Sequence, residues 1–165
     1  MIEVELKDEE LVAGLDRLAR HLTDLTPLMQ EIGEVMVEST KQRFLAGTSP
    51  EGVPWAPKSA ATLEAYAARG DSIDFRPLFG PSRRLSSEIS YLAGPESVEI
   101  GSALIYAGVH QFGAAEGAFG TMANGSPIPW GDIPARPFLG ISEQDRTNVL
   151  AAIDEWLARV VDAAD

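Results

Sequence analysis

Apolar residues recur every three or four positions in three stretches of the chain. This period predicts amphipathic helices over residues 8–22, 26–45 and 142–163. The apolar stripes consist of Leu11, Leu15, Leu18 and Leu22; of Leu28, Ile32, Val35 and Met36; and of Val149, Ile153, Trp156, Leu157 and Val160. We expect each stripe to bury one face of its helix against a sheet.

The residues at the predicted helix ends support these limits. Thr26-Pro27 supplies an N-cap followed by a proline at the first helical position, and Ser142 with Asp145 resembles a capping box. Gly33 lies inside the second helix, where glycine costs about 1 kcal/mol relative to alanine. We therefore expect a neighbouring backbone to approach closely at Gly33.

Alternation of apolar and polar residues predicts strands in three places. Residues 2–6 alternate in this way at the N-terminus, and 88–102 contains two alternating runs separated by a Gly-Pro turn, which predicts a β-hairpin. Residues 137–141 are expected to form an edge strand, because Pro137 cannot donate a ladder hydrogen bond. The prediction is an α+β fold in one domain, residues 1–165: an antiparallel sheet of about four strands packed against two or three helices, with long loops.

Shorter elements and loops complete the pattern. Ser59 is placed to cap a short helix through Tyr66, and the chain from Leu104 to Phe112 predicts another that ends at Gly113. Residues 113–131 are small, polar and rich in glycine. A segment of this length without regular structure is either functional or disordered.

Composition and charge exclude several classes of function. The chain has no cysteine, so disulfides, thiolate metal sites and cysteine nucleophiles are absent. It carries 25 acidic and 13 basic residues, a formal charge of −12, and we expect no tight binding to nucleic acid. The same charge leaves open an acidic inhibitor that mimics nucleic acid and binds a host enzyme. With neither a signal peptide nor a membrane-spanning run, the chain is expected to be made in, and stay in, the cytoplasm.

Residues that could carry catalysis or bind a metal are sparse. The two histidines are far apart, and His110 has no carboxylate at helical spacing. Asp132 precedes Ile-Pro and is typical of a turn. Nucleophile-elbow, P-loop and dinucleotide motifs are absent. We expect no enzyme activity, no metal and no cofactor, although a hydrolase that uses His110 and Asp132 remains an alternative.

Candidate interface residues are large or charged side chains in loops. Trp55, Phe119 and Trp130 lie in segments with little to bury them, so each either folds back or anchors an interface. Arg83 and Arg84 form the only adjacent basic pair, at either a solvated helix end or a docking point. Proline-flanked Arg136 completes the set.

Five short motifs occur in a fixed order along the chain. They are Phe44 with Gly52-Val-Pro-Trp55, Leu85-Ser-Ser-Glu-Ile89, Ile100-Gly-Ser, Tyr106-Ala-Gly-Val-His110-Gln111-Phe112-Gly113 and Ile133-Pro-Ala-Arg136-Pro137-Phe138-Leu139-Gly140. In this combination the chain resembles the tailed-bacteriophage virion morphogenesis proteins, the Mu-like tail completion family, over roughly residues 1–160. It departs where Pro-Ser-Arg-Arg precedes Leu85, since the family pattern has a Thr-Gly pair there.

The resemblance implies a structural role in phage assembly. A protein of this family completes the tail and supports head-tail joining, as a subunit of a neck or tail-end ring, with itself and other tail or neck proteins as partners. Its location would be the virion, after synthesis in the bacterial cytoplasm. The motifs at Tyr106–Gly113 and at Pro137 and Phe138 carry over as family landmarks without catalytic roles.

Overall fold

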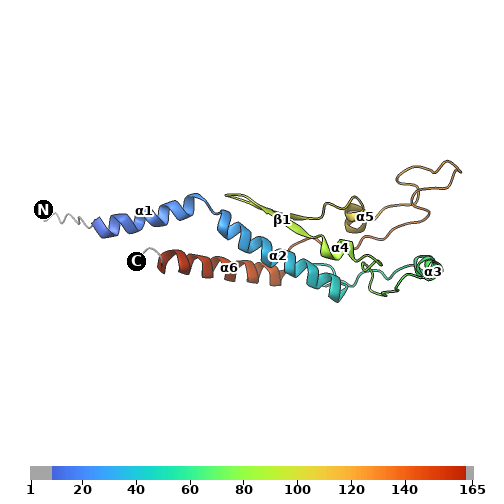
Figure 1. The fold of residues 1–165 in the computed structure, drawn as a ribbon, viewed down its shortest axis with the longest axis horizontal. Helices are drawn as coiled ribbons and strands as arrows, with labels where there is room; N and C mark the ends of the chain where they lie inside the picture. The colour runs from blue at the N-terminus through green and yellow to red at the C-terminus, as the bar shows by residue number, and fades with distance from the viewer. Residues whose placement is uncertain (1–8, 163–165) are drawn as a thin grey trace.

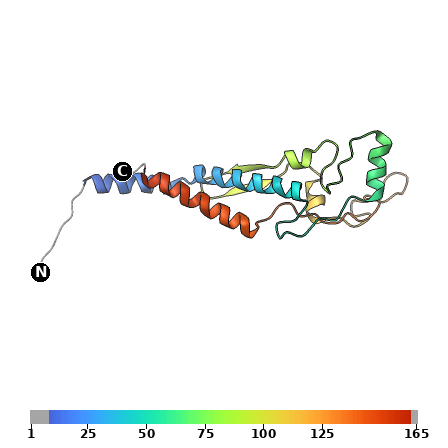
Figure 2. The ribbon, with the colours of Figure 1, turned by 90° about the horizontal axis from the view of Figure 1, so that it is seen from below.

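The computed structural model describes residues 9–162, which form an elongated α+β molecule (Figures 1 and 2). The predicted strand at residues 2–6 lies outside the described residues. In chain order the elements are α1 (Glu9–Thr23), α2 (Thr26–Ala46), α3 (Ala60–Arg69), α4 (Arg84–Ser87), β1 (Ser90–Ala93), β2 (Val98–Gly101), α5 (Ala107–Phe112) and α6 (Glu143–Asp162). The three long predicted helices and the two short ones are confirmed, each within a few residues of its expected limits.

Helices α2 and α6 lie side by side and run in opposite directions, and they build the first of two apolar cores (Figure 1). The buried residues of this core are Leu28, Ile32, Met36, Trp156 and Val160. Most of the predicted stripe of α6 therefore faces α2. Leu157 is an exception, because its side chain is 37% exposed, and Ala152 is buried on that helix instead.

Two residues of the predicted apolar stripe of α1 are not buried as the sequence predicted. Leu15 and Leu22 are 57% and 50% exposed, and Val12 is 57% exposed. The physical reason is the position of the helix: α1 extends beyond the hairpin and contacts α6 near the C-terminal end of that helix (Figure 1). The prediction that this helix packs on the sheet is wrong for these side chains.

The sheet consists of two antiparallel strands within the described residues, not about four. Strands β1 and β2 pair from Ser90 opposite Gly101 to Ala93 opposite Val98, as the hairpin prediction requires. One face of this hairpin packs on α2.

Residues 137–141 do not form the predicted edge strand. The backbone N–H groups of Phe138 and Leu139 both donate to the side-chain oxygen of Gln111, at 3.0 Å each. The side-chain amide of Gln111 donates in return to the carbonyl of Leu139 at 3.0 Å. A side chain thus satisfies the polar groups that a neighbouring strand would otherwise bind.

A second apolar core lies around the C-terminal half of α2 and collects aromatic side chains from distant loops. Phe44 and Phe138 are fully buried, with ring centroids 5.2 Å apart. Trp55 and Phe79 meet Phe44 edge-on, at 5.6 and 6.3 Å. Edge-to-face contacts are favourable for aromatic rings. Because the loops contribute these rings, the long irregular segments are fixed to the helices.

Gly33 is required by an aromatic ring rather than by a neighbouring backbone. A Cβ atom at this position would lie 2.5 Å from two ring carbons of Tyr91 in β1. The expected close approach therefore exists, but a side chain makes it. Gly33 allows the hairpin to pack directly on α2.

The Gly33→Ala variant is expected to lose about 1–3 kcal/mol of stability through overpacking against Tyr91. The matched control is Gly108→Ala in α5, where the space around the added Cβ is open and alanine should stabilise the helix by up to about 1 kcal/mol. Urea unfolding of both variants measures the difference. Stabilisation by both substitutions would show that Tyr91 does not pack on Gly33.

Candidate interaction surfaces

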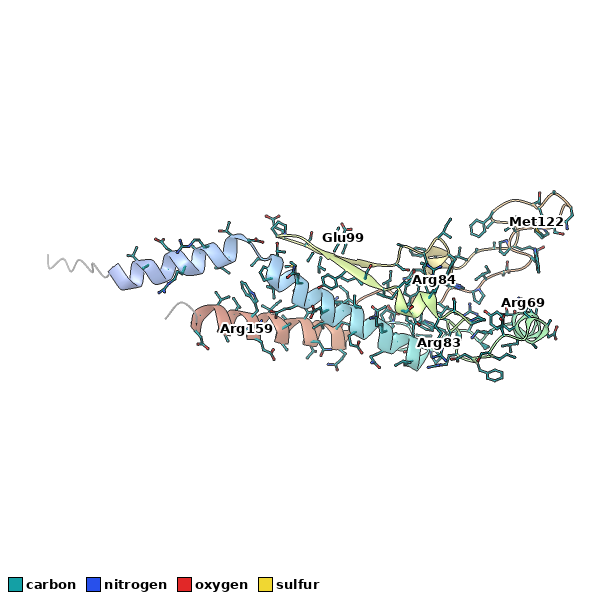
Figure 3. All side chains as sticks on the ribbon, in the orientation of Figure 1. Arg69, Arg83, Arg84, Glu99, Met122 and Arg159 are labelled. Atoms are coloured by element: carbon teal, nitrogen blue, oxygen red, sulfur yellow. The ribbon has the colours of Figure 1, made fainter. Side chains whose placement is uncertain are left out.

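The glycine-rich segment forms a hydrogen-bonded arm, which we define as residues 114–133. At its base Ala114 and Ile133 exchange two backbone hydrogen bonds, at 2.9 and 2.7 Å. Further out, the N–H of Phe119 donates to the carbonyl of Ile128 at 2.8 Å, and that of Met122 donates to Ser126 at 2.8 Å. Figure 3 places Met122 far from the helical core. The arm is therefore an ordered projection built from two antiparallel sides.

The predicted aromatic residues divide into two groups. Phe119 and Trp130, both in the arm, are 57% and 77% exposed. Trp55 is buried in the second core, and its indole N–H donates to the carbonyl of Pro137 at 2.9 Å. Of the two alternatives for each residue, Trp55 therefore folds back. Phe119 and Trp130 stay accessible, and their interface role remains a prediction.

Arg136 is an internal anchor at the base of the arm. Its guanidinium donates to the carbonyls of Ala56 and Pro57, at 2.7 and 2.8 Å. Its backbone N–H donates to the backbone carbonyl of His110 at 2.7 Å. The side chain is buried, and burial lowers the pKa of its guanidinium. An exposed docking role is thus not available to Arg136 in this conformation.

Residues 137–140, which include the landmarks Pro137 and Phe138, are held by side chains from several elements. Besides the bonds from Gln111 and Trp55, Arg43 of α2 donates to the carbonyls of Phe138 and Gly140, at 3.0 Å each. Arg43 also forms a buried ion pair with Asp145 in the first turn of α6. These landmark residues therefore have structural roles that join the arm, α2 and α6.

Gly113 directly precedes the arm and allows the two sides of the arm to lie close together at its base. Its φ is +75°, and a Cβ atom there would lie 2.7 Å from the carbonyl oxygen of Ile133. Both the backbone conformation and the close approach require glycine.

The aromatic landmarks of α5 and its start face different surroundings. The His110 ring meets Tyr106 edge-on at 6.0 Å, whereas Phe112 is 80% exposed. The Nδ1 atom of His110 is buried without a hydrogen-bond partner, and burial together with the charge of Arg136 lowers the pKa of this imidazole.

Arg83 and Arg84 are exposed at the start of α4 but differ in their contacts. Arg84 forms an ion pair with Glu88 one turn later, at 2.5 Å. Arg83 has a φ of +54°, the one positive value for a non-glycine residue within 9–162. This conformation costs an arginine about 1–2 kcal/mol. Its guanidinium lies 3.7 Å from Asp74.

A cleft of 560 Å³ separates the base of the arm from α3 and the chain that leads into α4. Tyr106, His110 and Asp132 are among its lining residues. Its cationic lining residues are Lys58, Arg83, Arg84 and Arg136. The structure therefore brings Arg83, Arg84 and Arg136 together at one cleft, and leaves Phe119 and Trp130 on the arm outside it.

The structure also bears on the alternative of a hydrolase that uses His110 and Asp132, and on metal binding. Asp132 accepts a hydrogen bond from the backbone N–H of Glu116 at 2.9 Å, which fits its predicted turn role. Within 9–162, no group of histidine and carboxylate side chains has the arrangement of a metal site. No described helix combines the length and apolar character needed to span a bilayer.

Two features of this region were missed by reasoning from the sequence. Lys58 was passed over as a loop lysine, although its ammonium group donates to the carbonyls of Asp74 and Arg76. The contacts of Gln111 with residues 138 and 139 were also missed. The only available signal for Gln111 was its place inside a family motif.

Comparison with known proteins identifies the family. The model of the phage virion morphogenesis family matches residues 6–158. The chain is 28% identical over 162 residues to Mu-like prophage FluMu G protein 2 of Haemophilus influenzae, covering 98% of this chain and 99% of the relative. It is 29% identical over 140 residues to tail completion protein S of Escherichia phage P2, covering 79% and 85%. No solved structure matches significantly. Because the family model spans nearly the whole chain, this protein belongs to the phage virion morphogenesis family.

Proposed function

We propose that this chain completes the phage tail and supports joining of the tail to the head. The observation that carries the proposal is the family match over residues 6–158, together with a relative named tail completion protein S. A role in phage tail assembly follows from this membership. The proposed location is the tail or neck of the virion, with other tail proteins as partners.

The shape of the molecule supports a joining role. Exposed apolar side chains of α1 lie at one end, and the arm with Phe119 and Trp130 lies at the other (Figures 1 and 2). Large exposed apolar groups are typical of protein interfaces. The two ends differ in structure, so one subunit presents two different adhesive surfaces.

Two different surfaces suit a ring of identical subunits. A head-to-tail contact joins unlike surfaces of neighbouring copies, and it closes into a ring when the rotation permits. We include such a ring, at the neck or the tail end, in the proposal. Its negatively charged surface would repel DNA that passes through. Micromolar affinity for DNA at physiological salt would contradict this part.

The proposed role is non-catalytic and needs no cofactor. Arg136, Gln111 and Trp55 are committed to contacts inside the fold, and Asp132 supports the arm. His110 and Asp132 line the same cleft, so the double substitution to alanine tests the hydrolase alternative directly. Normal assembly by that variant would remove the alternative. The inhibitor alternative has no support among the relatives named above.

Deletion of the gene in an inducible lysogen tests the proposed function. We expect electron micrographs to show filled heads separate from unattached tails, and plasmid expression of the chain to restore joined particles. Normal, infectious virions from the deletion strain would refute the proposal.

The arm yields a more specific prediction. A variant with Phe119→Ser and Trp130→Ser is expected to unfold within about 0.5 kcal/mol of wild type, because both side chains are exposed. It should nevertheless fail to restore tail completion in the deletion strain. Micrographs and infectious titre measure the effect.

The control is Val53→Ser with Phe75→Ser, which changes two exposed apolar side chains outside the arm. This variant should restore assembly. Equal rescue by both variants would exclude the arm as a docking surface.

A further inference from the structure

The cleft between the arm and α3 concentrates positive charge in an acidic protein. Four cationic side chains line it against one carboxylate, Asp132, although the whole chain carries a formal charge of −12. Ion pairs extend from the lining residues: Arg83 lies near Asp74, which also pairs with Arg76, and Arg84 pairs with Glu88. These pairs add one cation and two carboxylates to the neighbourhood of the cleft. The neighbourhood therefore still holds five positive charges against three negative ones.

Two of the lining cations have no carboxylate in direct contact among the described residues. Arg136 donates to the carbonyls of Ala56 and Pro57, and Lys58 donates to those of Asp74 and Arg76. Carbonyl groups orient both cations, and the Asp74 carboxylate acts on Lys58 from a longer distance. Burial lowers the pKa of both groups, because it disfavours their charged forms.

Arg83 adds a cation that is held in an unfavourable backbone conformation. Its φ of +54° would suit glycine or asparagine better, yet arginine occupies the edge of the cleft. Figure 3 shows Arg83 and Arg84 close together, far from Arg159 on α6. The turn therefore places a cationic side chain at the edge of the cleft.

Apolar side chains and aromatic rings also line the cleft, together with the hydroxyl groups of Ser59, Thr62 and Ser82. Tyr66, Leu78 and Tyr106 line the cleft beside the cations. His110 also lines the cleft, although its Nδ1 atom is buried. Carboxylates and apolar side chains occur together in a peptide. A long DNA polyanion would also meet the acidic surface elsewhere on the chain, which disfavours it.

We propose that this cleft binds an acidic peptide segment of a partner protein, with its carboxylates at Arg83 and Lys58, next to the buried positive charge of Arg136, and its apolar side chains against Tyr66 and Tyr106. The inference rests on the proposed function for the identity of the partner as another tail protein. Because hydrogen bonds to backbone carbonyls already position Lys58, little freedom of that side chain is lost on binding.

A labelled synthetic peptide tests the cleft directly. The probe is a short, end-capped fluorescein peptide in which glutamate alternates with leucine, and its control carries glutamine in place of glutamate. Fluorescence anisotropy at low salt should show the acidic probe binding at least about tenfold more tightly than the neutral one. Added salt should weaken that binding.

Charge removal at the cleft supplies the matched variants. Arg83→Asn with Arg84→Gln should weaken binding of the acidic probe about tenfold, and asparagine tolerates the backbone conformation at residue 83. Arg146→Gln with Arg159→Gln removes two charges from exposed ion pairs of α6 and should leave binding unchanged. No binding, equal binding of both peptides, or equal loss in both variants would overturn the proposal. Displacement of the probe by millimolar inorganic phosphate would overturn it too, because the site would then select small anions.

Complementation of the deletion strain separates this inference from the proposed function. If deletion blocks tail completion and the cleft variant fails to restore it while the α6 variant succeeds, both ideas stand. If the folded cleft variant restores joined particles as well as wild type, the cleft inference alone fails. A deletion strain that assembles normally would defeat the proposed function, and the anisotropy result would still decide whether the cleft binds an acidic peptide.

Discussion

Replacement of Asp145 by alanine is expected to lower the free energy of unfolding by about 3–5 kcal/mol. Asp145 is fully buried, and its carboxylate accepts hydrogen bonds from the backbone and hydroxyl of Ser142, at 2.6 and 2.7 Å. It also accepts from Ser39 and pairs with Arg43. The substitution leaves Arg43 as an uncompensated buried cation and removes the carboxylate half of the Ser142–Asp145 capping box. Urea or thermal unfolding measures the loss.

The matched control is Asp154→Ala, an exposed aspartate on the same helix, which should change stability by less than about 0.5 kcal/mol. Acid provides a second measurement. Burial raises the pKa of Asp145, but hydrogen bonds from Ser39 and Ser142 and the charge of Arg43 outweigh burial and hold the pKa below its ordinary value of 3.8. The carboxylate therefore stabilises the fold above that value, and this contribution falls as the pH drops below it. If Asp145→Asn loses stability in acid as steeply as wild type, the buried pair is not the source.

Replacement of Trp156 by alanine is expected to cost about 3–5 kcal/mol. Trp156 is buried between α6 and α2 in the first core, where it is grouped with Ile32 and Met36. The large cavity left by the indole cannot close without moving a helix. Calorimetry or urea unfolding, with tryptophan fluorescence as a second probe, measures the change.

The neighbouring substitution Leu157→Ala serves as the control, because Leu157 is 37% exposed. It should cost less than about 1 kcal/mol. The opposite order, with Leu157 more costly than Trp156, would mean that α6 presents a different face to α2.

Much of the helical structure could be predicted from the sequence because local signals agree there. Proline near the start of α2 and the Ser142–Asp145 pair at the start of α6 located both helix starts. The predicted N-cap Thr26 is wrong, however, because α2 begins at Thr26 and its N-cap is Leu25, without a side-chain hydrogen bond. A local pattern does not show, however, which surface an apolar stripe meets. The stripe of α1 was assigned to the sheet, yet Leu15 and Leu22 are exposed. Their partner, if another subunit supplies it, is not encoded in the local spacing.

The predicted number of strands was too high at residues 137–141, because a side chain there binds the backbone groups that a neighbouring strand would bind. Residues 137–141 have the composition of an edge strand, but Gln111 binds the N–H groups of Phe138 and Leu139. Such a contact joins residues 27 and 28 positions apart, and no periodicity reveals it. The family motifs contained both partners, so the resemblance located the right residues without giving their roles.

In the candidate site, too, the sequence identified single residues but not the tertiary contacts between them. Arg83, Arg84 and Arg136 were recognised from the sequence as charged residues of interest, but their convergence on one cleft depends on the tertiary fold. Lys58 was missed because a single lysine in a loop has no distinctive pattern. For Phe119, Trp130 and Trp55 the sequence left burial and an interface role equally open, and the tertiary structure separates the exposed Phe119 and Trp130 from the core residue Trp55.

The hydrogen bonds between the two sides of the arm have a kinetic consequence for assembly. Because Ala114 pairs with Ile133 and Phe119 with Ile128 before any partner arrives, the backbone there does not have to become ordered during docking. Encounters between subunits should then succeed at a rate set by diffusion and orientation rather than by a slow loop-folding step. A growing particle would incorporate such a subunit quickly, which favours one tail reaching one head before competing contacts form.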